Sequence, residues 1–436
     1  MSVGLAGLRI PASWRWWPLK RAALSISRGS APDYVEDGPV WAVSQAANQP
    51  GGLDWSRARF HAFGGNPANL KGLLRPGDVL INSTGRGTLG GVGYFTGSPD
   101  RRVAMADGHV TRVRVRPDVL HPRFAYYYLS SDPFQHYIYS ALIVGATNQI
   151  ELVGERLASA PIPMPPIEEQ RRIADLLDAK VAVLDRLSAL SLQQLSLMDE
   201  RLVELCRAMT TGTLRSIDHV ETGVPWMPKV ASGWALNRVG RVFRTGSGTT
   251  PKSSEATYFE GDVPWVNTGD LRDGPVTAVN RRVSRLALRE YPTLALYRPG
   301  SLIVAMYGAT IGRVGMLETE ACVNQACCVL SQATLVDTRF AFYWFLSHRS
   351  EIIRLASGGG QPNISQDIVR GLRIPAPDLH EQREIVQKID REWDRAAAMR
   401  SALSRRINHL TERRQALITA AVTGQVEVTT AGGMDV

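Results

Sequence analysis

Residues 85–90 carry glycines at the first, third and sixth positions, which is the spacing of the fingerprint that binds the pyrophosphate of a dinucleotide. A strand is expected before them, and Asp107 follows seventeen residues after the last glycine. Such a site also needs a helix directly after the glycines, because the helix N-terminus holds the phosphates. Residues 91–97 are instead typical of a strand and a turn. We therefore interpret the glycines as a tight bend between strands, and keep a nicotinamide or flavin enzyme as an alternative that bound-cofactor absorbance would reveal.

Other catalytic patterns do not occur in the sequence. Residues 66–69 read Asn-Pro-Ala-Asn, which is not the Asn/Asp-Pro-Pro-aromatic loop of amino-methyltransferases. The Gly-x-x-x-x-Gly-Lys-Ser/Thr loop of a nucleotide-driven motor is missing, and the eight histidines lack a Ser or Cys nucleophile pattern. We expect the chain to be non-catalytic, with any chemistry carried out by partners.

The four cysteines argue against a metal site. They show neither Cys-x-x-Cys spacing nor histidines at zinc-ligand intervals along the chain. We expect reduced, mostly buried thiols and no bound metal at Cys206, Cys322, Cys327 and Cys328.

An internal duplication is the strongest pattern in the chain. Ile162 begins the segment Ile-Pro-Met-Pro-Pro-Ile-Glu-Glu-Gln-Arg, and Ile374 begins its second copy, Ile-Pro-Ala-Pro-Asp-Leu-His-Glu-Gln-Arg. Gln170 matches Gln382 at an interval of 212 residues, and the same interval holds to the end of both copies. A constant interval over such a length indicates a repeated structural unit.

Each copy continues into a long helix. Apolar residues recur at steps of three and four, prolines stand at the expected start, and Gly212 and Gly424 stand at the expected ends. The first helix must carry the chain about 65 Å from one domain to the next, at ~1.5 Å per residue. If the second helix pairs with the first, it must run back antiparallel, and the two apolar seams then cover each other in a coiled-coil-like rod.

The regions before the two helices resemble each other as well. Short β-rich runs and glycine-rich turns predict a mixed α/β domain in each. Landmarks repeat although the residues between them diverge: 75–81 returns as 298–304, 123–127 as 339–343, and Trp14 as Trp234. The predicted fold class is α/β (α+β): two similar mixed domains joined by two long antiparallel helices, with pseudo-two-fold symmetry. The predicted segments are a first domain at 1–161, a first long helix at 162–212, a linker at 213–225, a second domain at 226–373, a second long helix at 374–424 and a C-terminal tail at 425–436.

The composition favours an acidic partner. The net charge is +9 and the pI about 9.6, and nucleic acid is the commonest partner of such a chain. Only six of the fifty basic residues are Lys, and arginine suits phosphate and guanine recognition, although a GC-rich genome would produce the same bias. No apolar run approaches the ~18 residues that span a bilayer, and Arg9 and Arg15 interrupt any signal-peptide core. We expect a cytoplasmic protein.

Taken together, these motifs resemble the specificity (S) subunit of type I restriction-modification systems. The resemblance rests on the two Ile-Pro-x-Pro-x-x-x-x-Gln-Arg segments, the long helices, the Val422-Thr423-Gly424 end and the Gly233-Trp234 opening, and it covers nearly the whole chain. The first copy departs from the pattern, because it ends in Thr-Thr-Gly and its Trp14 lacks a preceding glycine.

The resemblance implies that each domain is a target recognition domain that reads one half of a bipartite, interrupted sequence in double-stranded DNA. It also implies that the paired helices set the spacer and dock two modification (methyltransferase) subunits, with restriction (motor/nuclease) subunits joining that core. S-adenosylmethionine and ATP/Mg would then bind to the partner subunits, and no cofactor would bind to this chain.

Candidates for base contact follow from chemistry, because major-groove readout uses Arg, Asn, Gln, Ser or Thr on loops. The first domain offers Asn82, Ser83, Thr84, Arg86 and Thr88, then Thr147, Asn148 and Gln149. The second offers Asn267, Thr268, Tyr307, Thr310, Arg313, Gln361 and Asn363. The same residue types also simply form turns. An alternative for the whole chain is a coiled-coil scaffold whose domains bind only proteins.

Overall fold

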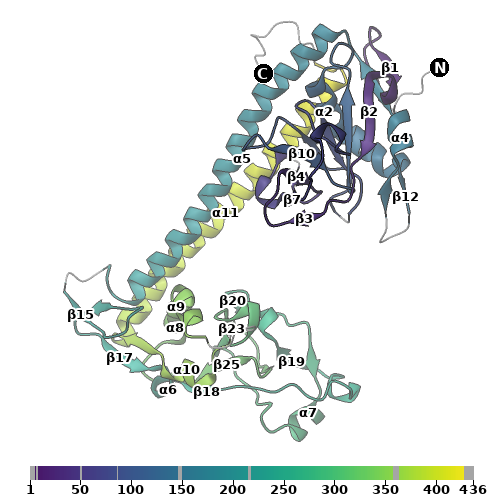
Figure 1. Cartoon of the computed structure of the whole chain (residues 1–436). Helices are drawn as coiled ribbons and strands as arrows, with labels where there is room; N and C mark the ends of the chain where they lie inside the picture. The colour runs from purple at the N-terminus through teal and green to yellow at the C-terminus, as the bar shows by residue number, and fades with distance from the viewer. Residues whose placement is uncertain are drawn as a thin grey trace. The chain divides into compact units, whose positions relative to one another are not determined.

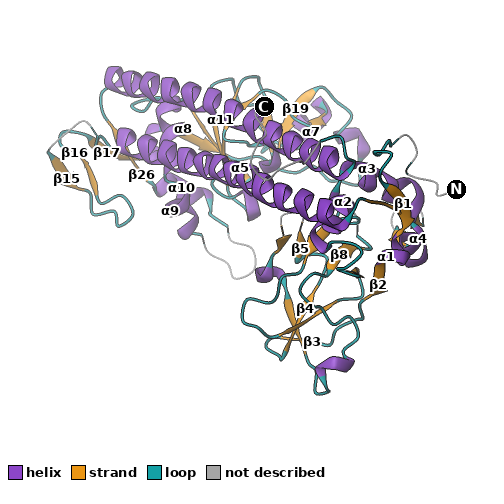
Figure 2. Cartoon of the chain, turned by 90° about the horizontal axis from the view of Figure 1, so that it is seen from above, coloured by secondary structure: helices purple, strands orange, loops and turns teal. Residues whose placement is uncertain are grey.

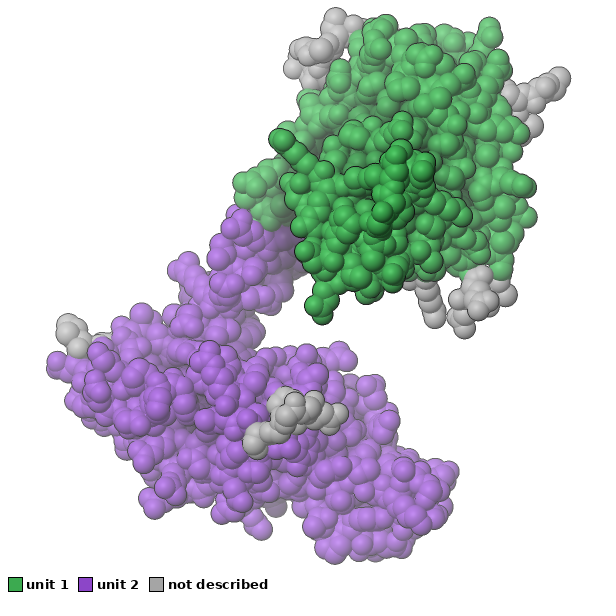
Figure 3. All heavy atoms as spheres, viewed as in Figure 1, with its two compact units in different colours: residues 1–191, 405–436 green, residues 192–404 purple. Residues whose placement is uncertain are grey.

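The computed structural model describes residues 5, 8–49, 52–85, 87–145, 150–214, 218–356 and 363–426. The longest elements are two helices of 44 residues each, α5 (Ile167–Thr210) and α11 (Leu379–Val422) (Figure 1). The chain forms two compact units, residues 1–191 with 405–436 and residues 192–404 (Figure 3). Each unit therefore contains part of both long helices.

Unit 1 is built on two four-stranded sheets. The first has the order β2-β11-β8-β9 and is antiparallel throughout; the second has the order β10-β4-β7-β3, with β10 and β4 parallel. The strand bounds are β2 Ala23–Arg28, β11 Val110–Val115, β8 Val79–Asn82, β9 Val92–Tyr94, β10 Val103–Ala106, β4 Val40–Val43, β7 Arg59–His61 and β3 Tyr34–Val35. Side chains alternate along β8, so that Val79 and Ile81 pack in the core that contains helix α2 (Pro122–Ser130), while Leu80 packs in the core of the second sheet.

Short elements complete unit 1. A two-stranded pair, β1 (Arg15–Pro18) with β14 (Pro161–Met164), lies next to the start of α5 in the chain. The others are α1 Leu19–Ala22, β5 Asn48–Gln49, β6 Gly52–Leu53, η1 Trp55–Arg57, η2 Pro67–Asn69, α3 Asp132–Tyr137, η3 Ile138–Leu142, β12 Ile143–Val144, β13 Glu151–Leu152 and α4 Gly154–Ser159.

Unit 2 repeats this plan. Its main sheet has the order β18-β25-β22-β23-β20, whose first four strands follow the order and direction of β2-β11-β8-β9. A smaller sheet has the order β21-β19-β24, again with one parallel pair. The strand bounds are β18 Arg244–Gly246, β25 Cys327–Ser331, β22 Leu302–Ala305, β23 Val314–Leu317, β20 Gly274–Val276, β21 Arg282–Val283, β19 Val263–Val266 and β24 Cys322–Val323. The two similar domains expected from the sequence are therefore confirmed.

Two further features of unit 2 have counterparts in unit 1. Strand β17 (Ala235–Arg238) pairs with β26 (Arg373–Ala376), as β1 does with β14, and helix α8 (Thr338–Ser347) packs on the main sheet as α2 does. The others are β15 His219–Glu221, β16 Lys229–Ala231, α6 Val239–Val242, η4 Ala256–Tyr258, η5 Thr268–Asp270, α7 Arg285–Glu290, η6 Gly308–Thr310, α9 Arg349–Arg354 and α10 Gln366–Gly371. All four cysteines are buried and free.

A glutamine at the same place in both copies of the duplication makes the same three hydrogen bonds in each. Gln170 is buried in the first turns of α5, where its amide donates to the carbonyls of Val119 (3.2 Å) and Pro165 (2.9 Å) and accepts from the backbone N–H of His121 (2.7 Å). Gln382 makes the same three bonds at the start of α11, to Leu335 (2.9 Å), Pro377 (2.7 Å) and Asp337 (2.7 Å). Each glutamine thus fastens a long helix to the loop that precedes α2 or α8.

The two long helices run antiparallel in each unit, as expected, and lie side by side in Figure 2. In unit 1, Asp185 of α5 pairs with Arg414 of α11 (2.9 Å), and Ile173 and Ile418 share the core. In unit 2, Asp199 pairs with Arg400, and residues near the end of α5 share a core with residues near the start of α11. None of the described helices is long and apolar enough to cross a membrane.

The core of unit 2 contains a neutral histidine that makes its stability depend on pH. His348 is 1 % exposed, shares a 2.9 Å hydrogen bond with the carbonyl of Trp344 through Nδ1, and stacks on the Trp344 ring at 4.9 Å. Burial lowers the pKa of His348 to about 4, and the charge of Arg207 acts in the same direction. Protonation of the unfolded chain below about pH 6.5 then favours unfolding, because the folded imidazole stays neutral.

We therefore expect unit 2 to lose about 3 kcal/mol of stability as the pH falls from about 6.5 to 4. This stability is fully present above pH 6.5. Urea unfolding at several pH values measures it, and the His348→Phe variant, which keeps an aromatic ring in place, should show a flatter profile over this window. Equal pH dependence in both proteins would contradict the assignment.

Candidate nucleic-acid interface

Loops from four strands of unit 2 meet at one edge of its sheets. Met306, after β22, donates its backbone N–H to the carbonyl of Ala326 (2.8 Å), and Ile364 donates to the carbonyl of Met306 (2.9 Å). Asn324, after β24, donates its backbone N–H to the carbonyl of Val266 at the end of β19 (3.0 Å). The loops at residues 267, 306–307, 324–326 and 363–364 therefore lie together at one end of the strands, although Asn267 and Asn363 are 96 positions apart in the chain. We call this end of the sheets the unit 2 edge.

The unit 2 edge presents three exposed candidates. Tyr307 is 41 % exposed and forms an antiparallel bridge with Asn363, whose side chain is also exposed. Arg313 is exposed at the other end of the turn between β22 and β23. An aromatic ring, an amide and a guanidinium are side chains that can bond to or pack on base edges in the major groove.

Other candidates at this edge hold its loops in place. Thr310 donates its hydroxyl to the carbonyl of Tyr307 (3.1 Å), which stabilises the turn η6. Asn267 caps the turn η5 together with Asp270 and accepts a hydrogen bond from the Asn324 amide (3.1 Å). Thr268, the first residue of that turn, is partly buried. These side chains position the exposed ones.

Four polar residues at this edge were missed by the sequence-based selection. Thr250 and Gln325 bond to each other, Ser247 donates to the carbonyl of Cys327 (2.9 Å), and Asn324 bonds to Asn267. The pair Asn324-Gln325 lies between two apolar runs, and this pattern could have indicated the loop before β25. Ser247 and Thr250 could not be found from a local pattern, because only the order of the strands brings residues 247–250 beside that loop.

The equivalent edge of unit 1, the unit 1 edge, is built differently. Asn82 and Ser83 are buried at the end of β8, where the amide oxygen of Asn82 accepts from the Asn48 amide (2.9 Å) and Ser83 bonds to the hydroxyl of Thr111. In this conformation the two side chains do not face solvent. A base could reach them only if the loop opened, so we interpret them as supports of the edge.

The partly buried Thr84 lies closer to the surface of the unit 1 edge. Its hydroxyl bonds to Gln45 (3.2 Å) and to the ring of His109 (2.8 Å), two residues that the sequence-based selection missed. Thr88 donates to the carbonyl of Thr84 (3.3 Å) and so holds the loop. Asp107 accepts from the backbone N–H of His109 (2.8 Å), and burial raises the pKa of this carboxyl. Arg86, Thr147, Asn148, Gln149 and Gln361 lie outside the described residues.

The glycine pattern at residues 85–90 belongs to the hairpin between β8 and β9. Gly85 and Gly90 have φ angles of 98° and 84°, which glycine adopts without strain, and the N–H of Gly90 donates to the carbonyl of Asn82 (2.9 Å). Strand β9 follows, in the place where a dinucleotide fingerprint needs a helix. The bend between strands that the sequence predicted is therefore present.

Comparison with known proteins decides the family. A family model described as the type I restriction modification DNA specificity domain matches residues 65–196 and 231–403. The chain belongs to this family. It is a type I restriction-modification specificity subunit with two DNA specificity domains, and the alternative of a protein-binding scaffold is not favoured. The first matched stretch contains Thr84 and His109 of the unit 1 edge, and the second contains Tyr307, Arg313 and Asn363 of the unit 2 edge.

Relatives support this assignment. The chain is 22 % identical to the putative type I restriction enzyme MjaX specificity subunit of Methanocaldococcus jannaschii over 323 residues, which cover 72 % of this chain and 71 % of that protein. It is also 22 % identical to the type I restriction enzyme EcoBI specificity subunit of Escherichia coli over 344 residues, which cover 74 % and 69 %.

Solved structures share the fold. A chain from a structure of the type I R-M system matches with a TM-score of 0.72 at 20 % identity, covering 96 % of this chain and all of that one. The HsdS subunit from Thermoanaerobacter tengcongensis matches with a TM-score of 0.52 at 20 % identity, covering 97 % and 99 %. The specificity subunit described here thus has the fold of its family.

Proposed function

We propose that the two domains of this specificity subunit read the two halves of a bipartite, interrupted sequence in double-stranded DNA. The proposal rests on a difference between the side chains of the unit 1 edge and those of the unit 2 edge, which occupy equivalent positions in the two domains. The unit 2 edge presents Tyr307, Arg313 and Asn363, whereas the unit 1 edge presents Thr84 and His109 on the same frame of strands. Different side chains on one frame favour different base pairs, so the half-sites should differ.

The chain itself is proposed to be non-catalytic, with methylation and cleavage carried out by partners in the cytoplasm. The paired helices would set the spacer between half-sites and dock two modification (methyltransferase) subunits, to which restriction (motor/nuclease) subunits join. Val183, Leu190 and Leu197 support a docking role, because they are exposed on α5 at intervals of seven residues and so share one face. S-adenosylmethionine and ATP/Mg would bind to those partners.

Exchanging residues 226–373 for the matching region of a related specificity subunit tests the proposal. In cells that supply the methyltransferase subunit, one half of the methylated motif should change, while the other half and the spacing stay the same. Sequencing that detects methylated bases measures the motif, and exchange of residues 1–161 is the matched control that should change the opposite half. An unchanged motif after both exchanges would contradict modular readout.

A further inference from the structure

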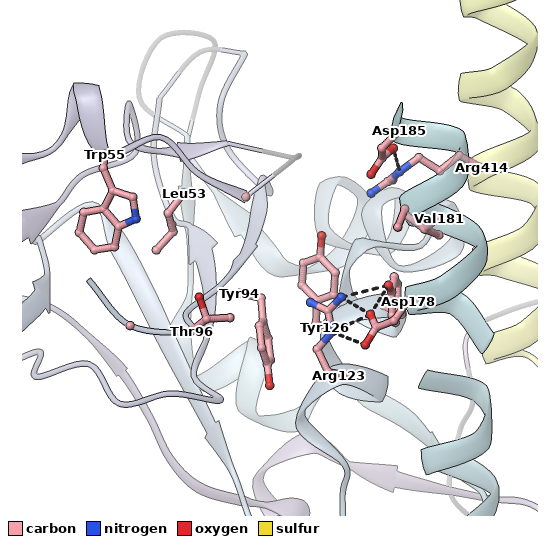
Figure 4. A pocket seen from close by; sticks show the side chains of 14 residues that line it. Leu53, Trp55, Tyr94, Thr96, Arg123, Tyr126, Asp178, Val181, Asp185 and Arg414 are labelled. Carbon is pink, nitrogen blue, oxygen red and sulfur yellow. Dashed lines mark hydrogen bonds and ion pairs between the residues drawn. The ribbon is translucent and has the colours of Figure 1, made fainter. Parts of the chain in front are cut away.

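A pocket of about 320 Å³ lies in unit 1 and is lined by residues of β6, β9, α2 and both long helices (Figure 4). One wall is formed by Trp55 and by Tyr94 of β9, and the other by Tyr126 of α2 together with Asp178, Val181 and Asp185 of α5. Arg123 of α2 also lines the pocket and pairs with Asp178. The volume falls in the range of about 300–1,000 Å³ that is typical of sites for small ligands. None of the functions above uses this pocket.

The internal duplication shows what fills the corresponding place in unit 2. The hydroxyl of Tyr127 donates to Asp178 (2.6 Å) on α5, and that of Tyr343 donates to Asp390 (2.5 Å) on α11, 212 positions later. One helical turn beyond each aspartate, unit 1 has Val181 and unit 2 has Trp393. The Trp393 ring packs against Tyr343 with centroids 5.7 Å apart. In unit 2 an indole therefore stands at the position of Val181, which lines the pocket in unit 1.

The neighbouring positions differ in the same direction. In unit 1, Arg414 pairs with Asp185 at the border of the pocket (2.9 Å). At the interval of 212 residues these positions are Leu202 and Ala397 in unit 2, and Leu202 is buried. At these two positions unit 2 thus has apolar side chains, whereas unit 1 has an ion pair beside an open volume.

The lining of the pocket indicates a planar aromatic ligand that carries an N–H donor. Trp55 offers an aromatic face, against which a ring packs in offset or edge-on geometry. The guanidinium of Arg123 lies over the rings of Tyr94 (4.7 Å) and Tyr126 (4.9 Å) and offers a planar cation on which an aromatic ring also stacks. The side chain of Asp185 is 49 % exposed, and a carboxylate that accepts one bond from Arg414 has further acceptor sites. We infer that the pocket binds an indole-like ring supplied from outside the chain, in the place that Trp393 takes in unit 2.

Indole itself is the probe for the full-length chain, measured by titration calorimetry. Wild type should bind one equivalent, Val181→Trp should weaken binding about tenfold or more by filling the pocket, and Trp393→Val should add a second site. Benzofuran, which lacks the N–H, should bind more weakly than indole. The thermal midpoint of each variant checks its fold.

A wild-type protein that does not bind indole would overturn the inference. So would a folded Val181→Trp protein that binds indole as well as wild type. Asp185→Ala provides a second variant that leaves the pocket open. It should reduce the difference in affinity between indole and benzofuran. An unchanged preference for indole in that variant would count against the role of Asp185 as the acceptor.

The source of the ring is decided by repeating the titration on the chain assembled with its methyltransferase partner. This arm rests on the proposed function, whereas the titration of the isolated chain does not. Loss of indole binding on assembly would identify an aromatic side chain of the partner, and retained binding would identify a free small molecule. Both outcomes agree with an aromatic site in unit 1.

Discussion

Replacement of Gln170 by alanine should destabilise unit 1 by about 3–5 kcal/mol, because it leaves one buried carbonyl, one partly buried carbonyl and one partly buried N–H without partners. These groups belong to the loop before α2 and to the start of α5, so the loss should also loosen the attachment of the helix. Urea unfolding measures the change in the free energy of unfolding. Limited proteolysis followed by mass spectrometry shows which unit opens first.

The duplication provides matched controls for this variant. Gln382→Ala should produce a similar loss in unit 2, because Gln382 makes the equivalent three bonds. Gln194→Ala changes an exposed glutamine in α5 and should have little effect. If Gln170→Ala and Gln194→Ala behaved alike, the three hydrogen bonds would not hold the helix in the way described.

Replacing Tyr307, Arg313 and Asn363 together by alanine should abolish most sequence-specific binding by the second domain. Each lost base contact weakens specific binding by about 1–3 kcal/mol, so three lost contacts should weaken binding to the target by about 3–9 kcal/mol, which is about a hundredfold or more, down to the level of non-specific binding. Non-specific binding depends on phosphate contacts and should fall much less. Fluorescence anisotropy with target and scrambled duplexes at fixed salt concentration measures both affinities.

Arg298→Ala is the matched control for this triple variant. Arg298 is exposed near the opposite end of β22, so its replacement removes the same charge away from the unit 2 edge. It should reduce specific and non-specific binding equally or not at all. An equal loss of both affinities in the triple variant would mean that the unit 2 edge contacts phosphates instead of bases.

Much of the fold was predictable because it follows from local patterns. The seams of α5 and α11 show a helical period, and the glycines at residues 85–90 occupy a bend that demands positive φ angles. The interface was less predictable. Asn82 and Tyr307 were both selected as loop residues, yet Asn82 is the buried last residue of β8, whereas Tyr307 lies two residues after β22 and is exposed.

The sequence by itself determined the duplication, the two long helices, their antiparallel course and the resemblance to specificity subunits. These properties depend on periodicity, on intervals along the chain and on connectivity. Only the tertiary structure decided which polar side chains reach the surface, what Gln170 and Gln382 bind, and where a pocket lies beside Val181, whose counterpart Trp393 packs on Tyr343 in the other repeat. Those properties depend on contacts between residues that are distant in the chain, and no local pattern records such contacts.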